Sequence, residues 1–501
     1  MLPIYPALIS KALNIPEKQV AATLDLLESG CTIPFISRYR KEATGSLDEV
    51  QIASIADQYE KLGEMQKRKV TILSTIEEQG KLTEALQKRV EDCWDATVLE
   101  DIYLPFKPKR RTRAMVAREK GLEPLANYLL SQATDLNQRP ATQQDVDHEL
   151  SLYINKEKGV DSADDALKGA QDIIAEMVAE DETARNTVRK NFSFDAVITS
   201  KKVKGKSEKG KIGDTEEDDF EQKAQKYRDY FDWKEPLKRC ASHRLLAMRR
   251  GEAEGVLRLS ISGDEGICID RLTRQFAKSS RSAASPLVAD AIIDSFKRLL
   301  GPSIETEYMQ QSKVAADQEA IRIFVRNLEQ LLMSAPLGQK RVLALDPGFR
   351  TGCKLVILDS EGNLLHHDVI YPHPPKSQFV DAMDKVESLV RKYRIEAISI
   401  GNGTASRESE RFIADTIKEA KRKVEYIIVS EAGASVYSAS KLAIEEFPDL
   451  TVEKRSAISI GRRLQDSLSE LVKIEPKSIG VGLYQHDVKE YFLHATAFLM
   501  M

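Results

Sequence analysis

The amino-acid sequence predicts a helix-rich, multidomain protein in which a helical N-terminal region precedes an α/β domain. The chain has 501 residues, enough for roughly three or four domains with buried cores. Helix-forming residues dominate its first half, and aromatic residues make up only 6% of the whole. From residue 341 onward, short apolar runs alternate with tight turns and amphipathic segments, which is typical of an α/β domain.

The composition is that of a soluble globular protein, with 42% hydrophobic and 30% charged residues and a net charge of -4. The five cysteines are scattered and form no C-x-x-C pair, which argues against a disulfide framework or a thiolate zinc site. We find no signal-peptide pattern and no run of about eighteen apolar residues. We therefore expect a cytoplasmic protein that does not enter a membrane and uses no cofactor.

Four regions follow one another along the chain. Residues 1–190 have apolar residues at helical spacing, and residues 191–335 mix helices with short strands around a charged, solvated loop at 201–221. The α/β domain is expected at 341–450, and a helical segment occupies 451–501. Smaller elements are predicted within the second region: a strand at 196–203, a helix at 236–250, a strand at 255–261 and a linker at 334–339.

The α/β domain has the element order of ribonuclease H-like folds. Strands are predicted at 341–346, 353–358, 364–371, 396–400 and 425–429. Helices are predicted at 376–393, 404–422, 432–446 and 453–471. Three strands in a meander, followed by alternating helices and strands, predict a five-stranded sheet with Asp346 at the end of its first, central strand.

Asp346 is the main candidate for chemistry, because it ends an apolar run and precedes a Pro-Gly turn and the basic residue Arg350. Two-metal nucleases need several converging carboxylates, and the candidate partners here are Glu431 and Asp466. The segment Gly401-Asn402-Gly403 stands where a further acid would help. The alternative is that Asp346 only begins a turn or positions a ligand, and we favour this structural role.

The stretch 106–120 holds seven basic residues and one acid. Such a segment suits contacts with phosphates, which give affinity independent of base sequence. The candidate contacts are Lys107, Lys109, Arg110, Arg111 and Arg113. In the alternative interpretation these side chains pair with acids such as Glu100 and Asp101.

A second basic cluster contains Arg38, Arg40 and Lys41, with Tyr39 between them. An exposed aromatic ring beside cations can stack on a nucleic-acid base. The alternative is a helix corner whose arginines bridge neighbouring helices.

Long segments of the chain resemble the bacterial Tex family of transcription accessory proteins. They are GCTIPFISRYRKEATGSLDE (30–49), LEDIYLPFKPKRRTRAMVAREKGLEPLA (99–126), YRDYFDWKEPLKRCASHRLLAMRRGEAEGVL (227–257), LALDPGFRTGCKL (343–355) and RRLQDSLSELVKIEPKSIGVGLYQHDV (462–488). The resemblance implies an elongated helical N-terminal region and a YqgF-type ribonuclease H-like domain that is not a nuclease. It also implies helix-hairpin-helix and OB-fold modules, but the residues after Asp487 depart from the family pattern, so we expect a chain truncated before these modules.

The first functional hypothesis is therefore a non-enzymatic scaffold that binds nucleic acid and acts in transcription, with RNA, DNA or both and the transcription machinery as partners. The second is a metal-dependent, structure-specific nuclease that uses Asp346, Glu431 and Asp466. The third is a truncated product with little activity of its own. The preference between RNA and DNA and the oligomeric state stay open.

Overall fold

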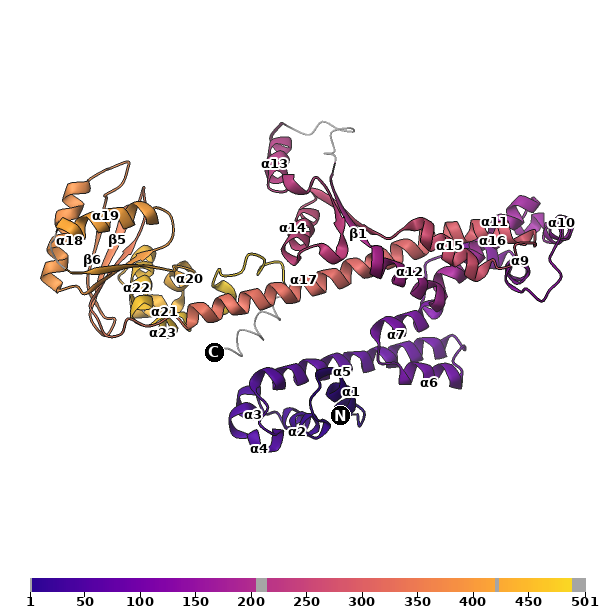
Figure 1. Cartoon of the computed structure of the whole chain (residues 1–501), viewed down its shortest axis with the longest axis horizontal. Helices are drawn as coiled ribbons and strands as arrows, with labels where there is room; N and C mark the ends of the chain where they lie inside the picture. Colours follow the sequence, from indigo (N-terminus) through magenta and orange to yellow (C-terminus); the bar gives the residue numbers. More distant parts are fainter. Residues whose placement is uncertain (1, 204–213, 420–422, 489–501) are drawn as a thin grey trace. The chain divides into compact units, whose positions relative to one another are not determined.

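The computed structural model describes residues 2–203, 214–419 and 423–488. The chain forms two compact units, Met1–Ala315 and Ala316–Met501. Figure 1 shows the order of the helices and strands in each unit. The boundary between the units falls inside the long helix α17 (Gly301–Leu332).

Most of residues 2–195 are helical, as the apolar spacing predicts. The α-helices are α1 (Tyr5–Leu13), α2 (Glu17–Glu28), α3 (Ile33–Tyr39), α4 (Lys41–Thr44), α5 (Glu49–Glu78), α6 (Glu84–Asp92), α7 (Ala96–Tyr103), α8 (Arg113–Glu119), α9 (Glu123–Thr134), α10 (Gln143–Leu152), α11 (Ala163–Glu180) and α12 (Glu182–Asp195). Helix α5 begins at a capping box, in which the Asp48 carboxylate accepts the Gln51 N–H at 2.7 Å and the Gln51 side chain accepts the Asp48 N–H at 3.1 Å.

The helix α11 forms the centre of a second helical layer. It packs against α8, α9 and α16 (Ala284–Ser295), and α15 (Glu265–Phe276) packs against α16. The buried side of α11 carries Ala166, Ala170 and Ile173. Small alanine side chains let the helices approach closely, so this layer is held by close packing.

A three-stranded antiparallel sheet lies between these helices in the sequence. Its strands are β1 (Val197–Lys202), β2 (Asp232–Pro236) and β3 (Leu257–Ser262), in the order β2-β1-β3. The predicted helix 236–250 is corrected here: residues 232–236 pair with β1, and helix α14 begins only at Ser242 and ends at Ala253.

The predicted loop 201–221 also needs correction. Its acidic part forms helix α13 (Asp214–Gln225). Residues 204–213, which hold most of the lysines of this block, lie outside the described part of the chain.

The second unit contains a five-stranded sheet with the order β6-β5-β4-β7-β8. Its strands are β4 (Val342–Asp346), β5 (Cys353–Leu358), β6 (Leu364–Ile370), β7 (Ala397–Gly401) and β8 (Glu425–Val429). The central strand β4 pairs antiparallel with β5 and parallel with β7. The predicted sheet, with Asp346 ending its first and central strand, is confirmed.

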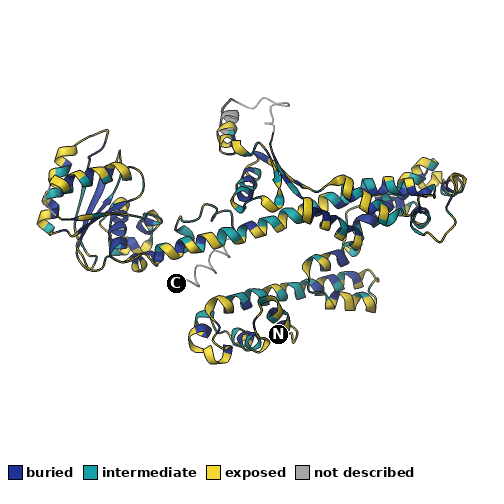
Figure 2. Cartoon of the chain, in the orientation of Figure 1, coloured by how far each residue is buried: buried dark blue, intermediate teal, exposed yellow. Residues whose placement is uncertain are grey.

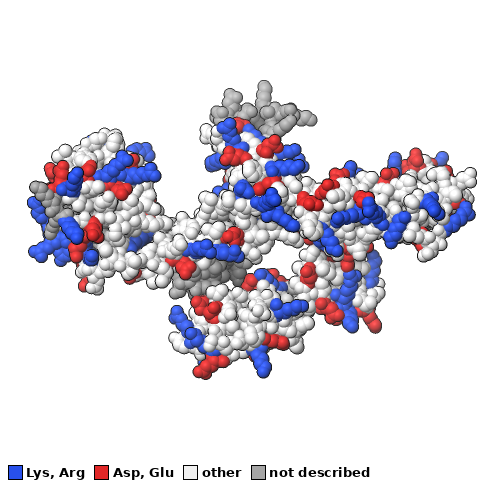
Figure 3. Space-filling model, viewed as in Figure 1, with Lys and Arg blue, Asp and Glu red and all other residues white. Residues whose placement is uncertain are grey.

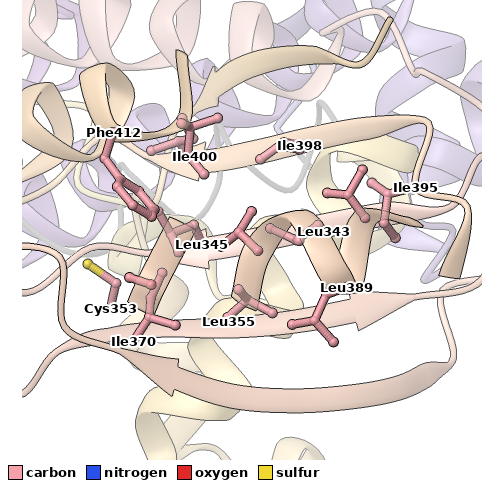
Figure 4. Close-up of a cluster of buried hydrophobic side chains, with 14 of the residues drawn as sticks. Leu343, Leu345, Cys353, Leu355, Ile370, Leu389, Ile395, Ile398, Ile400 and Phe412 are labelled. Atoms are coloured by element: carbon pink, nitrogen blue, oxygen red, sulfur yellow. The ribbon is translucent and has the colours of Figure 1, made fainter. Parts of the chain in front are cut away.

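Helices cover both faces of this sheet. On one face, α18 (Phe379–Tyr393) and α19 (Ser406–Glu419) bury a cluster that includes Leu345, Leu389 and Phe412 (Figure 4). On the other face, Ala457 and Ile458 of α22 (Val452–Gln465) pack against the sheet. Burial on both faces explains why β4 and β5 are almost continuously apolar (Figure 2).

Two predicted helices are each broken in two. The stretch 432–446 forms α20 (Ala434–Ala439) and α21 (Lys441–Glu446), and the stretch 453–471 forms α22 and α23 (Ser467–Leu471). The interruptions are Ser440 and Asp466, whose side chains accept N–H groups of the helix that follows. Among the described residues, no helix is both long and apolar enough to cross a membrane.

Candidate nucleic-acid interface and acidic site

Asp346 is the last residue of the central strand β4, so it lies at the end of the sheet where the parallel strands β4, β7 and β8 have their carboxyl ends. Burial raises the pKa of its carboxyl group to about 6; the hydrogen bond from Ser456 opposes this rise, and the nearby Glu431 adds to it. The group is thus mostly ionised at neutral pH, with its charge held in a partly dry environment.

Glu431 joins Asp346 at this end of the sheet, because it follows the parallel strand β8. Its carboxylate packs against the two glycines at the end of β7, Gly401 and Gly403. Its backbone N–H donates to Oδ1 of Asn402 at 3.0 Å, and the Asn402 N–H donates to the Val429 carbonyl at 3.1 Å. Asn402 therefore fixes the loop that carries the acid instead of supplying an acid itself.

Asp466 does not join the other two carboxylates. It caps α23, accepting the Ser469 N–H at 3.0 Å. The preceding Gln465 donates to the carbonyl of Lys340 at 2.8 Å, just before β4 begins. Helix α22 runs antiparallel to β4, so the C-terminal end of the helix lies near the start of β4, whereas Asp346 is at the end of this strand. Asp466 is therefore removed from the predicted set, whereas Glu453, which was not predicted, joins Glu431 in raising the pKa of Asp346.

A lysine, Lys354, lies beside Asp346 at this end of the sheet. Lys354 of β5 pairs directly with Asp346 across the sheet, and its ammonium lowers the pKa of that carboxyl group. The ammonium is nearly buried and donates to Thr351 Oγ1 at 2.6 Å and to the carbonyls of Thr351 and Gly352 at 3.2 and 3.1 Å. Lys354 thus shapes the loop that carries the exposed Arg350.

A buried arginine holds the other side of the site. Arg463 of α22 donates through Nη1 to the carbonyls of Ser430 at 2.8 Å and Ala432 at 2.7 Å, on either side of Glu431. Burial lowers the pKa of its guanidinium to about 10, and the carboxylates of Glu470 and Glu431 oppose this shift. Within the described residues, no group of three or more histidine, cysteine or acidic side chains is arranged to hold a metal ion.

The basic cluster near the N-terminus forms an exposed corner between α3 and α4, here called the α3–α4 corner. Its members are Phe35, Arg38, Tyr39, Arg40 and Lys41. Tyr39 is 68% exposed, and its ring centre lies 5.4 Å from that of Phe35. The Arg40 guanidinium lies 5.2 Å from the centre of the Phe35 ring. In the described structure, Arg38, Arg40 and Lys41 form no ion pair, so they do not bridge neighbouring helices through carboxylates.

The five candidate cations of the 106–120 stretch divide into two groups. Lys109 pairs with Glu180 and, at 3.5 Å, with Glu176, and Arg111 pairs with Glu119 at 2.8 Å. These two are engaged within the protein, although with other acids than the expected Glu100 and Asp101. The other three are exposed and have no ion pair among the described residues: they are Lys107, Arg110 and Arg113.

Glu100 and Asp101 have partners of their own. Glu100 pairs with Arg68 at 2.7 Å, and Asp101 is buried against Arg185, at 2.7 Å, and Arg189. Figure 3 shows that acidic and basic side chains alternate over much of the visible surface. The distribution of charge over the visible surface therefore does not single out an interface.

Comparison with known proteins gives three matches to family models along the chain. The Tex-like protein N-terminal domain matches residues 4–77, the Tex central region-like model matches residues 141–324, and the Tex protein YqgF-like domain matches residues 340–465. The chain belongs to the Tex family. The family resemblance found in the sequence is thereby confirmed.

Relatives of the Tex family align with nearly the whole chain. The transcriptional accessory protein Tex of Neisseria gonorrhoeae is 40% identical over 96% of this chain, and protein YdcI of Bacillus subtilis is 44% identical over 96%. The human S1 RNA-binding domain-containing protein 1 is 35% identical over 97%. The chain spans 61%, 64% and 48% of these relatives, respectively.

Sequence reasoning missed three residues of the Tex YqgF-like domain: Lys354, Ser456 and Arg463. A signal existed for the first, since a lysine inside the apolar strand CKLVIL is unusual. Arg463 and Ser456 carry no such signal, because both stand in a helix with ordinary polar neighbours.

Proposed function

We propose that this chain is a nucleic-acid-binding scaffold that acts in transcription in the cytoplasm, and that its YqgF-like domain has no nuclease activity. The observation that carries the binding proposal is the α3–α4 corner, with two exposed aromatic rings and three cations that have no carboxylate partner among the described residues. Cations contact phosphates, and a ring beside them stacks on a base.

Further cations extend this proposal. Lys107, Arg110 and Arg113 add phosphate contacts in the same unit, and Arg350 adds one in the YqgF-like domain. The printed names of two relatives, a transcriptional accessory protein and an S1 RNA-binding domain-containing protein, are in keeping with this proposal. A contact with the transcription machinery is part of it and is tested by co-purification of RNA polymerase before and after nuclease treatment.

The absence of nuclease activity is proposed from the acidic end of the sheet. Two-metal hydrolysis needs carboxylates that converge on both ions, and among the described residues no group of three or more histidine, cysteine or acidic side chains is arranged to hold a metal ion. Lys354 stands opposite Asp346 in the strand register, and its positive charge lowers the pKa of the carboxyl group that would bind a metal.

Binding is tested with labelled single- and double-stranded RNA and DNA across a salt series. The triple variant R38Q/R40Q/K41Q is compared with a control of equal charge, R274Q/R322Q/R391Q. Each control arginine is highly exposed and paired with an acid on its own helix. We expect the first variant to flatten the plot of log affinity against log salt by about 0.7–0.9 per lost contact, and the control to leave it unchanged. Equal slopes for both would reject the corner as the interface.

The purified wild-type chain is also assayed for nuclease activity, because Asp346 and Glu431 lie near each other. Cleavage of these substrates with Mg²⁺ or Mn²⁺, abolished by Asp346→Asn, would establish the nuclease alternative and reject the scaffold without chemistry. If the wild-type chain bound none of the substrates at low salt, the hypothesis of little autonomous activity would replace the binding proposal.

A further inference from the structure

The small sheet β2-β1-β3 has one face in the core and one face in solvent. Side chains alternate between the faces of a strand, and β3 shows this alternation completely. Leu257, Leu259 and Ile261 are buried, whereas the residues between and after them, Arg258, Ser260 and Ser262, are exposed. Helix α14 packs against this sheet in the same unit.

The strand register gathers three cations on the solvent face. Lys201 of β1 stands directly opposite Arg258 of β3. On the other side of β1, Lys234 of β2 stands opposite Thr199, two residues from Lys201. Neighbouring strands are about 4.8 Å apart, so the three side chains share one small area, here called the basic sheet face and defined by Lys201, Lys234 and Arg258.

The basic sheet face contains one pair of like charges that stand directly opposite each other, Lys201 and Arg258. Like charges directly opposite each other on neighbouring strands destabilise a sheet. Asp232 stands opposite Lys201 in the register, yet none of the three cations forms an ion pair in the described part of the chain. By contrast, Lys202 reaches Glu221 at 2.7 Å. A bound anion would remove the repulsion between Lys201 and Arg258.

Three neutral side chains of this face suit the same kind of ligand, whereas Val197 and Pro236, which also lie on it, are apolar. Thr199, Ser260 and Ser262 lie on it beside the cations, and hydroxyl groups donate hydrogen bonds to phosphate oxygens. None of the large exposed hydrophobic side chains belongs to the three strands, so the face has nothing to insert into a lipid bilayer.

We propose that the basic sheet face is a second contact surface for the phosphodiester backbone of a nucleic acid, separate from the α3–α4 corner. This inference rests on the proposed nucleic-acid-binding function and adds a surface to it. The flat face offers cations and hydroxyls but no aromatic stack, so it binds the backbone without reading bases, equally in single strands and duplexes.

The test uses the full chain and the triple variant K201Q/K234Q/R258Q, with R274Q/R322Q/R391Q as the control of equal charge. Binding of a labelled 20-nucleotide RNA, the matching DNA and their duplexes is measured across a salt series. We expect the salt slope to fall by roughly 2 to 3 for the sheet variant, because each lost phosphate contact removes about 0.7–0.9, and to stay the same for the control. An unchanged slope in the sheet variant overturns the inference.

The design separates this inference from the proposed function. If R38Q/R40Q/K41Q weakens binding and the sheet variant does not, the α3–α4 corner is supported as a contact surface and the basic sheet face is rejected. If the wild-type chain binds no nucleic acid, both fall together.

The single variant Arg258→Glu distinguishes binding from folding. Glutamate at 258 faces Lys201 and turns a repulsive pair into an attractive one, so the melting temperature should rise slightly while affinity falls more than in Arg258→Gln. Loss of affinity together with a lower melting temperature would instead assign Arg258 a structural role and overturn the inference.

Discussion

Glu431 rests directly on Gly403, and its carboxylate occupies the space that any side chain at 403 would need. A Cβ atom added at Gly403 would overlap Oε1 of Glu431, and one added at Gly401 would lie 2.8 Å from Oε2. The glycines of the segment Gly401-Asn402-Gly403 therefore leave the space that the Glu431 carboxylate fills. This fit explains the two glycines without any ligand.

The substitution Gly403→Ala should displace the Glu431 carboxylate and destabilise the YqgF-like domain by less than about 1 kcal/mol, because the atoms that the new methyl group meets are the far end of a flexible side chain. Urea unfolding of the purified chain measures this change. Gly480→Ala is the matched control in the same unit, since nothing lies within 4 Å of a Cβ atom there. Adding Glu431→Ala to Gly403→Ala should restore part of the lost stability, and strictly additive losses would contradict the proposed overlap.

Asp346→Asn should stabilise the protein above pH 6. The folded-state pKa of Asp346 is raised to about 6, above its ordinary value, so protonation favours the folded state. The stabilisation from the protonated form is complete below about pH 4 and is lost as the pH rises through 6. At pH 8 the amide should add about 2 kcal/mol, and the difference should vanish near pH 4. Unfolding curves at both pH values check this, and a less stable variant at pH 8 would refute it.

The cations of the 106–120 stretch should separate into two classes on mutation. Lys109→Ala should lower stability by roughly 2 kcal/mol, since it leaves the half-buried Glu180 without its cation while Glu176 keeps Arg118 at 2.5 Å, and should leave nucleic-acid affinity unchanged. The variant K107Q/R110Q/R113Q should do the reverse. Thermal unfolding measures the stability of both variants, and binding titrations measure their nucleic-acid affinity. Equal losses of affinity would show that ion pairing within the protein does not distinguish the binding cations from the structural ones.

Tyr39→Ala should weaken binding of single strands by about 1–3 kcal/mol, because a stacked base loses its partner. Duplex binding should change little, since paired bases are not available to the ring. Tyr39→Phe keeps an aromatic face and is the control. A similar loss in single strands and duplexes would point to disruption of the α3–α4 corner instead of lost stacking.

The strand order of the second unit was open to prediction from the sequence because it depends on local patterns. Apolar runs of strand length and the turns after Asp346 and Leu358 define the meander, and helical spacing defines the segments that follow. Short connections and buried parallel strands then leave few arrangements, so the central place of β4 followed from the sequence. Helix ends were less predictable: Ser440 and Asp466 are ordinary helix residues until their side chains cap the next turn.

Which side chains act together was decided by tertiary packing alone. Asp346 lies near Glu431 and Lys354 because β4 and β8 end, and β5 begins, at the same end of the sheet. Helix α22 instead places Asp466 near the start of β4, at the opposite end of the sheet. Electrostatic interactions fall off with distance through space, and that distance is set by packing between segments far apart in the chain. The sequence thus determined the family, the sheet and the position of Asp346. Only the folded chain determined which acids come together and which cations lack a carboxylate partner among the described residues.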